Sequence, residues 1–317
     1  MTIITELKRE DFDNVLKNYA IGRYKSHKHI DWALQNTVYL VNTTGGKYIL
    51  KIFEQSGIDF IKFQVRIIDY LASKGIPVAK ISKSSENKDI LFYKNKLIII
   101  QKFLLGNKPE EFDSKLTKNI ATIFSLMSRY LLKLKLKGKY VWRVDHQFKP
   151  NKDKRVSSIL GINFKDAEKN LLQQLRKINR KKLRKSVIHG DFHGPNLLVK
   201  DNKLNAIIDW DDCHEDYLAY EIAVFIMDSF VTEKKADKEQ IKIFFREYQK
   251  NLKLMAEEKK AIYYFVKQRF LGVIFWIYKQ TTKHKDLAKQ LEKRQKRVTK
   301  CYFNFEKISL EEFLKLS

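Results

Sequence analysis

The most restrictive feature of the sequence is the segment 187–212, VIHGDFHGPNLLVKDNKLNAIIDWDD. Its apolar start ends abruptly at a His-Gly-Asp turn that closes with Asp191, and two short strand-like runs follow on either side of a polar turn at 200–203. Strand-forming residues around such a turn predict a hairpin. This hairpin would bring Asn196, which precedes its first strand, close to Asp209, which follows its second strand.

These three side chains are of the types that phosphoryl transfer requires together. An aspartate such as Asp191 can orient the attacking hydroxyl and accept its proton, while Asn196 and Asp209 can hold Mg2+ on the phosphates of ATP. The order His-x-Asp-x-x-x-x-Asn is that of the protein-kinase catalytic loop, and Asp209 follows where the second metal-binding aspartate would stand. Gly190 replaces the arginine found at this point in protein kinases, which favours a kinase for small molecules.

The His-Gly-Asp, Asn and Ile-Asp-Trp elements, in this order, resemble the aminoglycoside phosphotransferase and choline kinase superfamily. The resemblance implies that Asp191 is the catalytic base and that Asn196 and Asp209 are the Mg2+ ligands. It also implies that His189 braces the loop and that His193 lines the substrate side. For His193, a satisfied polar side chain without contact to substrate is the alternative.

The residues that follow Asp209 allow more than one interpretation. Asp211 is a candidate substrate residue, and Asp211 or Asp212 could instead supplement the metal site or cap a helix that begins near residue 217. Trp210 is expected to pack beneath the metal-binding aspartate. Cys213 is expected to be a small buried residue and not a nucleophile.

Residues 1–103 are predicted to form a small β-rich, nucleotide-binding lobe. Two strand-like runs joined by Thr-Thr-Gly-Gly predict a hairpin over 37–53, and apolar residues at helical spacing predict a helix over 58–74. Two more strands are predicted at 90–93 and 97–103, separated by a polar turn.

Residues 104–317 are predicted to form a larger, mainly helical lobe that carries the catalytic loop and the substrate site. Outside the catalytic segment, helices are expected at 115–136, 164–184, 237–253, 256–280 and 283–300. The fold class is therefore α+β, and the resemblance implies a two-lobed, protein-kinase-like fold. Nucleotide clefts often lie between two such lobes.

The nucleotide side of the resemblance depends on Lys51, which lies on a predicted strand and would grip the α- and β-phosphates of ATP. A strand lysine that faces water is the alternative. No glycine occurs in residues 27–40, where a protein kinase has its glycine-rich loop, so Asn36 or Thr37 is expected to contact the phosphates.

Two further details of the nucleotide side follow from the same comparison. The predicted helix 58–74 contains no glutamate to pair with the lysine, which leaves Asp69 or Gln64 as its partner. Adenine is expected to bind backbone groups of the segment that joins the lobes. These cofactor-binding candidates are Gln101, Phe103 and Leu104.

The charge of the chain is strongly positive, with 63 Lys and Arg residues against 37 Asp and Glu residues, a net charge of +26. Such a surface attracts anions. The lysines are spread along the whole chain and no nucleic-acid-binding motif occurs, so a small molecule is the predicted partner and a nucleic acid is not. Two cysteines exclude a disulfide framework, and neither a secretory signal nor a membrane-spanning run is visible, which predicts a cytoplasmic protein whose oligomeric state stays open.

Within this superfamily, three regions resemble the homoserine kinase branch: residues 36–50, 222–228 and 246–276. Arg269, in the third region, is the candidate substrate-binding residue, because a guanidinium can hold a substrate carboxylate with two hydrogen bonds. Pairing with a nearby acid is the alternative. The predicted acceptor is homoserine or a similar amino-alcohol, with choline, sugars, aminoglycosides and the choice between ATP and GTP left open.

A catalytically silent, kinase-like binding protein is the alternative from another functional class. Degenerate copies usually lose at least one residue of the phosphoryl-transfer machinery. This sequence keeps the full set, which is Lys51, Asp191, Asn196 and Asp209.

Overall fold

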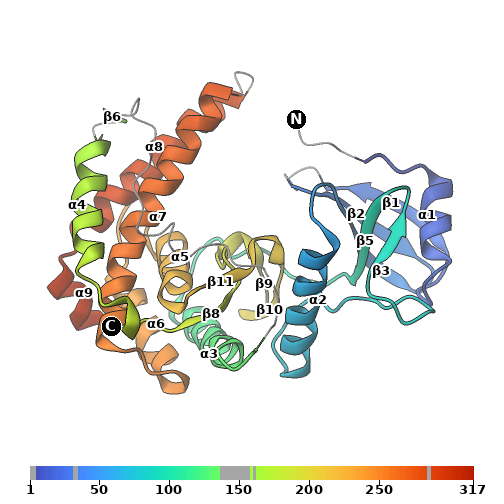
Figure 1. The fold of residues 1–317 in the computed structure, drawn as a ribbon, viewed down its shortest axis with the longest axis horizontal. Helices are drawn as coiled ribbons and strands as arrows, with labels where there is room; N and C mark the ends of the chain where they lie inside the picture. Colours follow the sequence, from blue (N-terminus) through green and yellow to red (C-terminus); the bar gives the residue numbers. More distant parts are fainter. Residues whose placement is uncertain (1–4, 31–34, 136–157, 160–161, 284–286) are drawn as a thin grey trace.

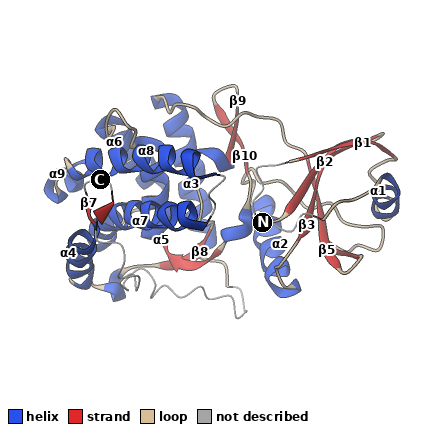
Figure 2. Cartoon of the chain, turned by 90° about the horizontal axis from the view of Figure 1, so that it is seen from above, coloured by secondary structure: helices blue, strands red, loops and turns tan. Residues whose placement is uncertain are grey.

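The computed structural model describes residues 5–30, 35–135, 158–159, 162–283 and 287–317. A β-sheet region forms one end of the molecule and a larger helical region forms the other (Figures 1 and 2). The predicted α+β, two-lobed arrangement is therefore confirmed. Parts of two predicted segments, residues 31–34 and 284–286, lie outside the described residues, as does residue 136.

The sheet region contains five antiparallel strands in the order β1-β2-β3-β5-β4. The strands are β1 (Tyr24–His29), β2 (Thr37–Thr43), β3 (Gly46–Phe53), β4 (Leu91–Tyr93) and β5 (Lys96–Lys102). The predicted hairpin is present as β2 and β3, whose register runs from Thr37 opposite Ile52 to Thr43 opposite Gly46. Helix α1 (Arg9–Leu16) was not predicted, and it inserts Phe12 into the core of the sheet region.

Helix α2 (Ile58–Ser73) lies between the sheet and the helical region (Figures 1 and 2). Its apolar face, which includes Ile61 and Leu71, belongs to the large core of the helical region and not to the core of α1 and β2. After the helix, the carbonyl of Pro77 accepts a hydrogen bond of 2.8 Å from the Ile207 amide. The apolar spacing predicted this helix correctly, but the side to which it packs is a property of the tertiary structure.

The helical region combines long helices with three short strand pairs. The helices are α3 (Ser114–Leu131), α4 (Phe164–Arg176), α5 (Leu218–Phe230), α6 (Lys238–Asn251), α7 (Ala256–Lys283), α8 (Ala288–Glu306) and α9 (Leu310–Leu316). The strand pairs are β6 (Ser158–Ile159) with β7 (Ile162–Asn163), β8 (Lys185–Ile188) with β11 (His214–Tyr217), and β9 (Leu197–Lys200) with β10 (Lys203–Ile207).

The helix predicted over 164–184 was too long. Helix α4 ends at Arg176, and the Asn179 side chain accepts a hydrogen bond of 3.2 Å from the Lys181 amide to start a short 3-10 turn. Asparagine side chains favour such turns over a continuing helix. The chain then enters β8, which leads directly into the His-Gly-Asp turn.

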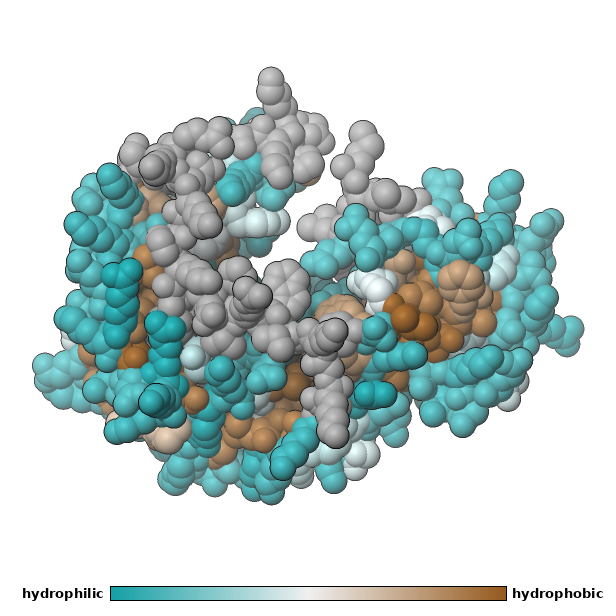
Figure 3. Space-filling view, viewed as in Figure 1, coloured by the Kyte–Doolittle hydropathy of each residue, from teal (hydrophilic) through white to brown (hydrophobic). Residues whose placement is uncertain are grey.

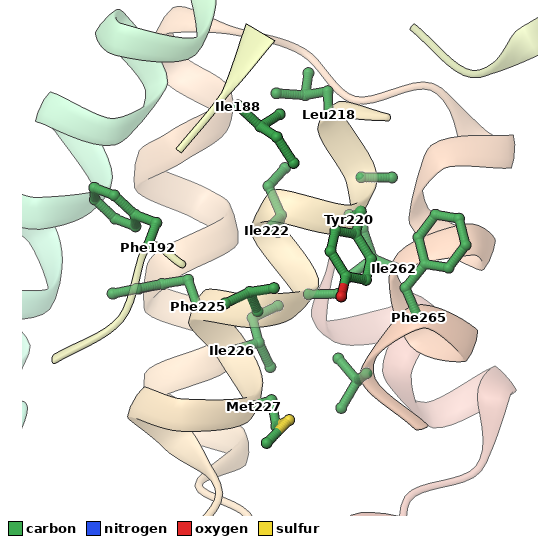
Figure 4. Close-up of a cluster of buried hydrophobic side chains, with 14 of the residues drawn as sticks. Ile188, Phe192, Leu218, Tyr220, Ile222, Phe225, Ile226, Met227, Ile262 and Phe265 are labelled. Carbon is green, nitrogen blue, oxygen red and sulfur yellow. The ribbon is translucent and has the colours of Figure 1, made fainter. Parts of the chain in front are cut away.

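Helix α5 is the buried centre of the helical region. Twelve of its 13 residues are buried, and Figure 4 shows Ile222, Phe225 and Ile226 packed near Ile188 and Phe192. These last two residues flank the His-Gly-Asp turn. The turn is therefore anchored at both ends by apolar side chains in the same core.

The chain crosses between the two regions after β5. On the sheet side, the Phe103 amide donates to the Lys47 carbonyl at 3.0 Å, and on the helical side Asn107 and Val199 exchange hydrogen bonds of 2.9 and 2.8 Å. The lobe boundary between residues 103 and 104 stays a prediction. Within the part of the chain that the structure describes, no helix is long and apolar enough to cross a membrane.

Candidate active site

His189 connects the His-Gly-Asp turn to the end of strand β10, just before Asp209. Its ring is fully buried, with Nε2 2.9 Å from the Ile208 carbonyl and Nδ1 accepting from the Asp191 amide at 3.4 Å. The ring also packs against buried Trp210, with the centroids 4.5 Å apart. Burial disfavours the charged ring and lowers the pKa of His189, so the neutral ring braces the loop.

Gly190 allows the catalytic turn to approach the segment that follows Asp209. Its φ is +82°, and a Cβ at this position would overlap the carbonyl oxygen of Asp212. A side chain is therefore excluded by both conformation and space. This steric requirement adds a second reason for glycine at a position where protein kinases carry arginine.

Glu221 on α5 is a residue that the sequence analysis missed. Its carboxylate is buried and accepts a hydrogen bond of 2.9 Å from the Gly190 amide. Burial raises the pKa of Glu221 to about 7. A single acid among the apolar residues of the first two turns of α5 was the available signal, because a buried carboxylate needs a specific partner.

The Asp191 carboxylate lies between two basic side chains. Arg269 from α7 donates to Oδ1 at 2.8 Å, and Nε2 of His193 lies 3.0 Å from Oδ2. Burial opposes ionisation of Asp191, but the His193 hydrogen bond and the charge of Arg269 outweigh burial and lower its pKa to about 2. The carboxylate is therefore ionised at neutral pH, as a proton acceptor must be.

His193 has a second acid on its other side. Its Nδ1 lies 3.9 Å from Oδ2 of Asp228, near the end of α5. Burial disfavours the charged ring, but the Asp191 carboxylate outweighs this and raises the pKa of His193. The ring thus links two carboxylates on the same side of the site.

Asn196 and Asp209 lie close to Asp191, as the hairpin predicted. The side-chain amide of Asn196 donates to the backbone carbonyl of Asp191 at 2.9 Å and to its Oδ2 at 3.2 Å. The backbone carbonyl of Asn196 accepts from the Ile208 backbone amide at 3.0 Å. Asp209 follows Ile208 with a φ of +63°, a left-handed conformation that aspartate tolerates better than most residues.

This pair fits a Mg2+ ion that is carried by a nucleotide. The Asp209 side chain is 55% exposed and lies 3.9 Å from Lys51, on the side where the phosphates are expected. Among the described residues, no group of three or more His, Cys, Asp or Glu side chains could hold a metal. Magnesium usually needs only one or two protein ligands, because phosphates and water complete its shell.

The partner of Lys51 is Asp211, which corrects the prediction of Asp69 or Gln64. Lys51 and Asp211 form a partly buried ion pair, and Gln64 donates to the same carboxylate oxygen at 3.2 Å. Burial disfavours the lysine cation, but Asp211 and Asp209 outweigh it and raise the pKa of Lys51. Asp69 instead lies near the charges of Asp89, Lys83 and Lys80.

This position also bears on the other roles considered for Asp211, of which a supplementary role in the metal site stays a prediction. Its carboxylate lies on the nucleotide side, so it is not placed as a substrate residue. Helix α5 begins after Tyr217 without a side-chain cap, so neither Asp211 nor Asp212 caps it. Cys213 is buried as expected, and burial raises the pKa of its thiol.

Asn36 and Thr37 have their polar groups occupied within the protein, which corrects their predicted contact with phosphates. Asn36 donates to Oδ2 of Asp211 at 2.7 Å and accepts from the Glu54 amide at 3.2 Å. Thr37 donates to Oε1 of Glu54 at 2.6 Å and accepts from the Thr5 amide at 3.0 Å. Asn36 therefore helps to position Asp211 beside Lys51, whereas Thr37 holds Glu54, which pairs with Lys96.

The adenine-binding candidates need a similar revision. The Gln101 side chain donates to the Ala79 carbonyl at 2.8 Å, and the Phe103 amide is used by Lys47. The Phe103 amide is therefore not available to a base, whereas the predicted role of the Gln101 backbone stays a prediction. Leu104, the third candidate, donates no backbone hydrogen bond of this kind among the described residues.

Comparison of the sequence with known protein families gives a match over most of the chain. The sequence profile of the phosphotransferase enzyme family matches residues 27–258. The chain belongs to this family. The superfamily predicted from the His-Gly-Asp segment is thereby confirmed.

Curated relatives of this phosphotransferase include two homoserine kinases. That of Methylobacillus flagellatus is 25% identical over 272 residues, covering 82% of each chain. That of Zymomonas mobilis is 24% identical over 266 residues, covering 82% of this chain and 83% of the relative.

Two solved structures share the fold of this phosphotransferase. A microcompartment-associated aminopropanol kinase has a TM-score of 0.72 at 15% identity, covering 96% of this chain and 98% of its own. The amicoumacin kinase hAmiN, solved with AMP-PNP and Ca2+, has a TM-score of 0.70 at 19% identity, covering 95% and 98%. With the family match, these findings identify the protein as an ATP-dependent kinase that acts on small molecules.

Proposed function

We propose that this kinase transfers the γ-phosphoryl group of ATP to the hydroxyl of homoserine or a similar amino-alcohol. The observation that carries the proposal is the ionised Asp191 carboxylate, held between Arg269 and His193. A cation therefore lies beside the proton acceptor, where a substrate carboxylate would also be bound. The names of the curated relatives support the same acceptor.

Asp191 is the catalytic base in this proposal. It accepts a hydrogen bond from the substrate hydroxyl and orients the oxygen toward the γ-phosphorus. It takes the proton as the new P–O bond forms and the bond from the γ-phosphorus to the bridging oxygen of the leaving ADP breaks. Asn196 fixes the carboxylate through the hydrogen bond to Oδ2. His193 holds the same oxygen from the substrate side.

Arg269 is proposed to hold a carboxylate of the substrate while it stays beside Asp191. Its Nη2 bonds to Asp191, and its buried Nε has no hydrogen-bond partner among the described residues. The Arg269 side chain as a whole is 26% exposed, so guanidinium donors that Asp191 does not use are open to a ligand. A guanidinium can serve both carboxylates because its donors point in several directions.

The nucleotide is proposed to bind between Lys51 and the pair Asn196 and Asp209. When bound, ATP supplies the phosphoryl group and Mg2+ neutralises the charge that develops on it. Lys51 would bind the phosphates, while Asn196 and Asp209 would ligate the metal. A cytoplasmic location remains a prediction.

The test is a coupled ADP-release assay with L-homoserine, choline, methylthioribose and kanamycin side by side. We expect turnover of L-homoserine with the highest kcat/KM of the four. Turnover of a sugar or of choline without turnover of homoserine would reject the proposed acceptor. Nucleotide binding without ADP release on any alcohol would instead favour a silent, kinase-like binding protein.

A further inference from the structure

Asp228 stands apart from every other residue of its helix. The 12 other residues of α5 are buried, whereas the Asp228 side chain is 30% exposed. Burial by neighbouring protein atoms nevertheless raises the pKa of Asp228. Its partly exposed carboxylate lies beside His193 of the catalytic loop, where a ligand can reach it.

Asp228 lies close to the catalytic residues. Oδ2 lies 3.9 Å from Nδ1 of His193, whose Nε2 is 3.0 Å from Asp191. Arg269 and Arg294 are the other cations that act on Asp228. The carboxylate is therefore separated from the catalytic base by one imidazole ring.

The known role of the site does not account for Asp228. It is not a metal-ligand candidate and it does not cap a helix, and Nδ1 of His193, its ion-pair partner, lies at 3.9 Å, beyond hydrogen-bond distance. Charged groups with unused hydrogen-bonding capacity at a functional site are candidates for ligand recognition. The chemistry of a carboxylate selects a cation with N–H donors.

We propose that Asp228 binds the ammonium group of the substrate, an inference that rests on the proposed function. The hydroxyl, the carboxylate and the ammonium of an amino-alcohol acid would then meet Asp191, Arg269 and Asp228 respectively. The substrate would present a neutral hydroxyl, a negative carboxylate and a positive ammonium to three separate side chains. Three such contacts select both the class of substrate and its stereochemistry. A substrate with a hydroxyl but no amine would make no charged contact with Asp228 and would therefore bind less tightly.

The experiment compares Asp228→Asn with the parent on four alcohols. L-homoserine carries an ammonium and a carboxylate, 3-aminopropan-1-ol only the ammonium, 4-hydroxybutanoate only the carboxylate, and butan-1-ol neither. The parent should prefer the two amines. In Asp228→Asn, kcat/KM for the amines should fall by about 10- to 100-fold, as expected for loss of a charged hydrogen bond.

The same variant should bind amine-free alcohols at least as well as the parent. Where turnover is too slow, the Ki for competitive inhibition replaces kcat/KM. Asp228→Glu keeps the charge and should retain part of the amine preference. Asp201→Asn, at the exposed turn between β9 and β10, is the matched control and should change neither class of substrate.

An equal loss for alcohols with and without an amine would overturn the role of Asp228 and indicate a structural residue. Loss of amine turnover in Asp228→Asn with unchanged KM for all substrates would overturn it as well. Failure of the proposed function shows separately, in the parent enzyme. If the parent uses 3-aminopropan-1-ol but not homoserine, the acceptor is wrong and Asp228 is still tested on the amine; if it accepts no amine, both proposals fall.

Discussion

The nucleotide side and the substrate side of the site differ in how completely their polar groups are satisfied. Around Lys51, the carboxylate of Asp211 is held by Lys51, Asn36 and Gln64 at once. Around Asp191, Arg269 keeps a buried Nε without a partner among the described residues, and Asp228 stays accessible. One side is a closed network within the protein, and the other has unused hydrogen-bonding capacity.

The difference shows where ligand recognition and structural stability are located. A closed, buried network contributes to stability, and it is strongly destabilised when one member is removed. A site with unsatisfied donors and acceptors costs stability until a ligand pairs them. Substitutions on the nucleotide side should therefore affect folding and binding together, whereas those on the substrate side should affect activity alone.

Asp191→Asn should give the largest effect and should leave the fold intact. We expect kcat to fall by about 10²- to 10⁴-fold, because an amide cannot accept the proton of the hydroxyl. ADP release measures kcat, and thermal unfolding measures the melting temperature, which should change little. Asp201→Asn serves as the control; a turnover for Asp191→Asn equal to that of the parent would refute the base assignment.

Asp211→Asn should have its main effect on stability. The change removes the nearer of the two carboxylates beside the partly buried Lys51 and leaves Asp209 at 3.9 Å, so we expect a loss of about 1–3 kcal/mol of unfolding free energy, below the cost for a fully buried pair. Urea unfolding measures the loss, with Asp13→Asn on the exposed face of α1 as the control. A double variant, Lys51→Met with Asp211→Asn, should recover part of the loss. If Asp211→Asn were as stable as the parent, the closed network would not be a source of stability.

Glu221→Gln should change how stability depends on pH. The pKa of Glu221 is raised from 4.5 to about 7 in the folded protein, so between these values the folded state holds a proton that the unfolded state has lost. The parent should therefore lose about 2–3 kcal/mol of unfolding free energy as the pH rises from 4.5 to 7, from this group alone. The Gln variant lacks this decline.

Urea unfolding at pH 4.5, 6 and 8 tests the prediction. The stability of Glu221→Gln relative to the parent should increase with pH, while the exposed control Glu215→Gln should follow the parent at every pH. Parallel curves for the parent and Glu221→Gln would contradict a raised pKa at this buried site.

The catalytic loop was predictable because its information is local. The spacing of Asp191, Asn196 and Asp209 within one hairpin fixes their proximity without knowledge of the rest of the chain. The hairpin of β2 and β3 was predicted for the same reason. Strand β1 was missed because its sequence, YKSHKH, is polar and mostly exposed, so no alternation of apolar residues marks it.

The partner of Lys51 could not be predicted from local sequence pattern. Asp211 is distant in sequence, and its contact depends on how the sheet region sits against the helical region. The same holds for Asn36 and Thr37, whose polar atoms bind Asp211 and Glu54 instead of remaining open. Sequence pattern identifies the side chains that can carry charge, but packing decides which of them neutralise one another.

The attachments of the crossover segment restrict how the two regions can move. Phe103 is bonded to the sheet through Lys47, Asn107 is bonded to β9 through Val199, and Pro77 is bonded to β10 through Ile207. Because α2 packs in the core of the helical region, the chain also passes between the two regions before α2 and after Pro77, so a rotation of the sheet must be absorbed at all three passages. In the crossover, Gly106 is packed against Leu198 and the Leu105 carbonyl accepts a hydrogen bond of 2.6 Å from the Asn205 side chain, so the helical region holds this segment from residue 105 onward.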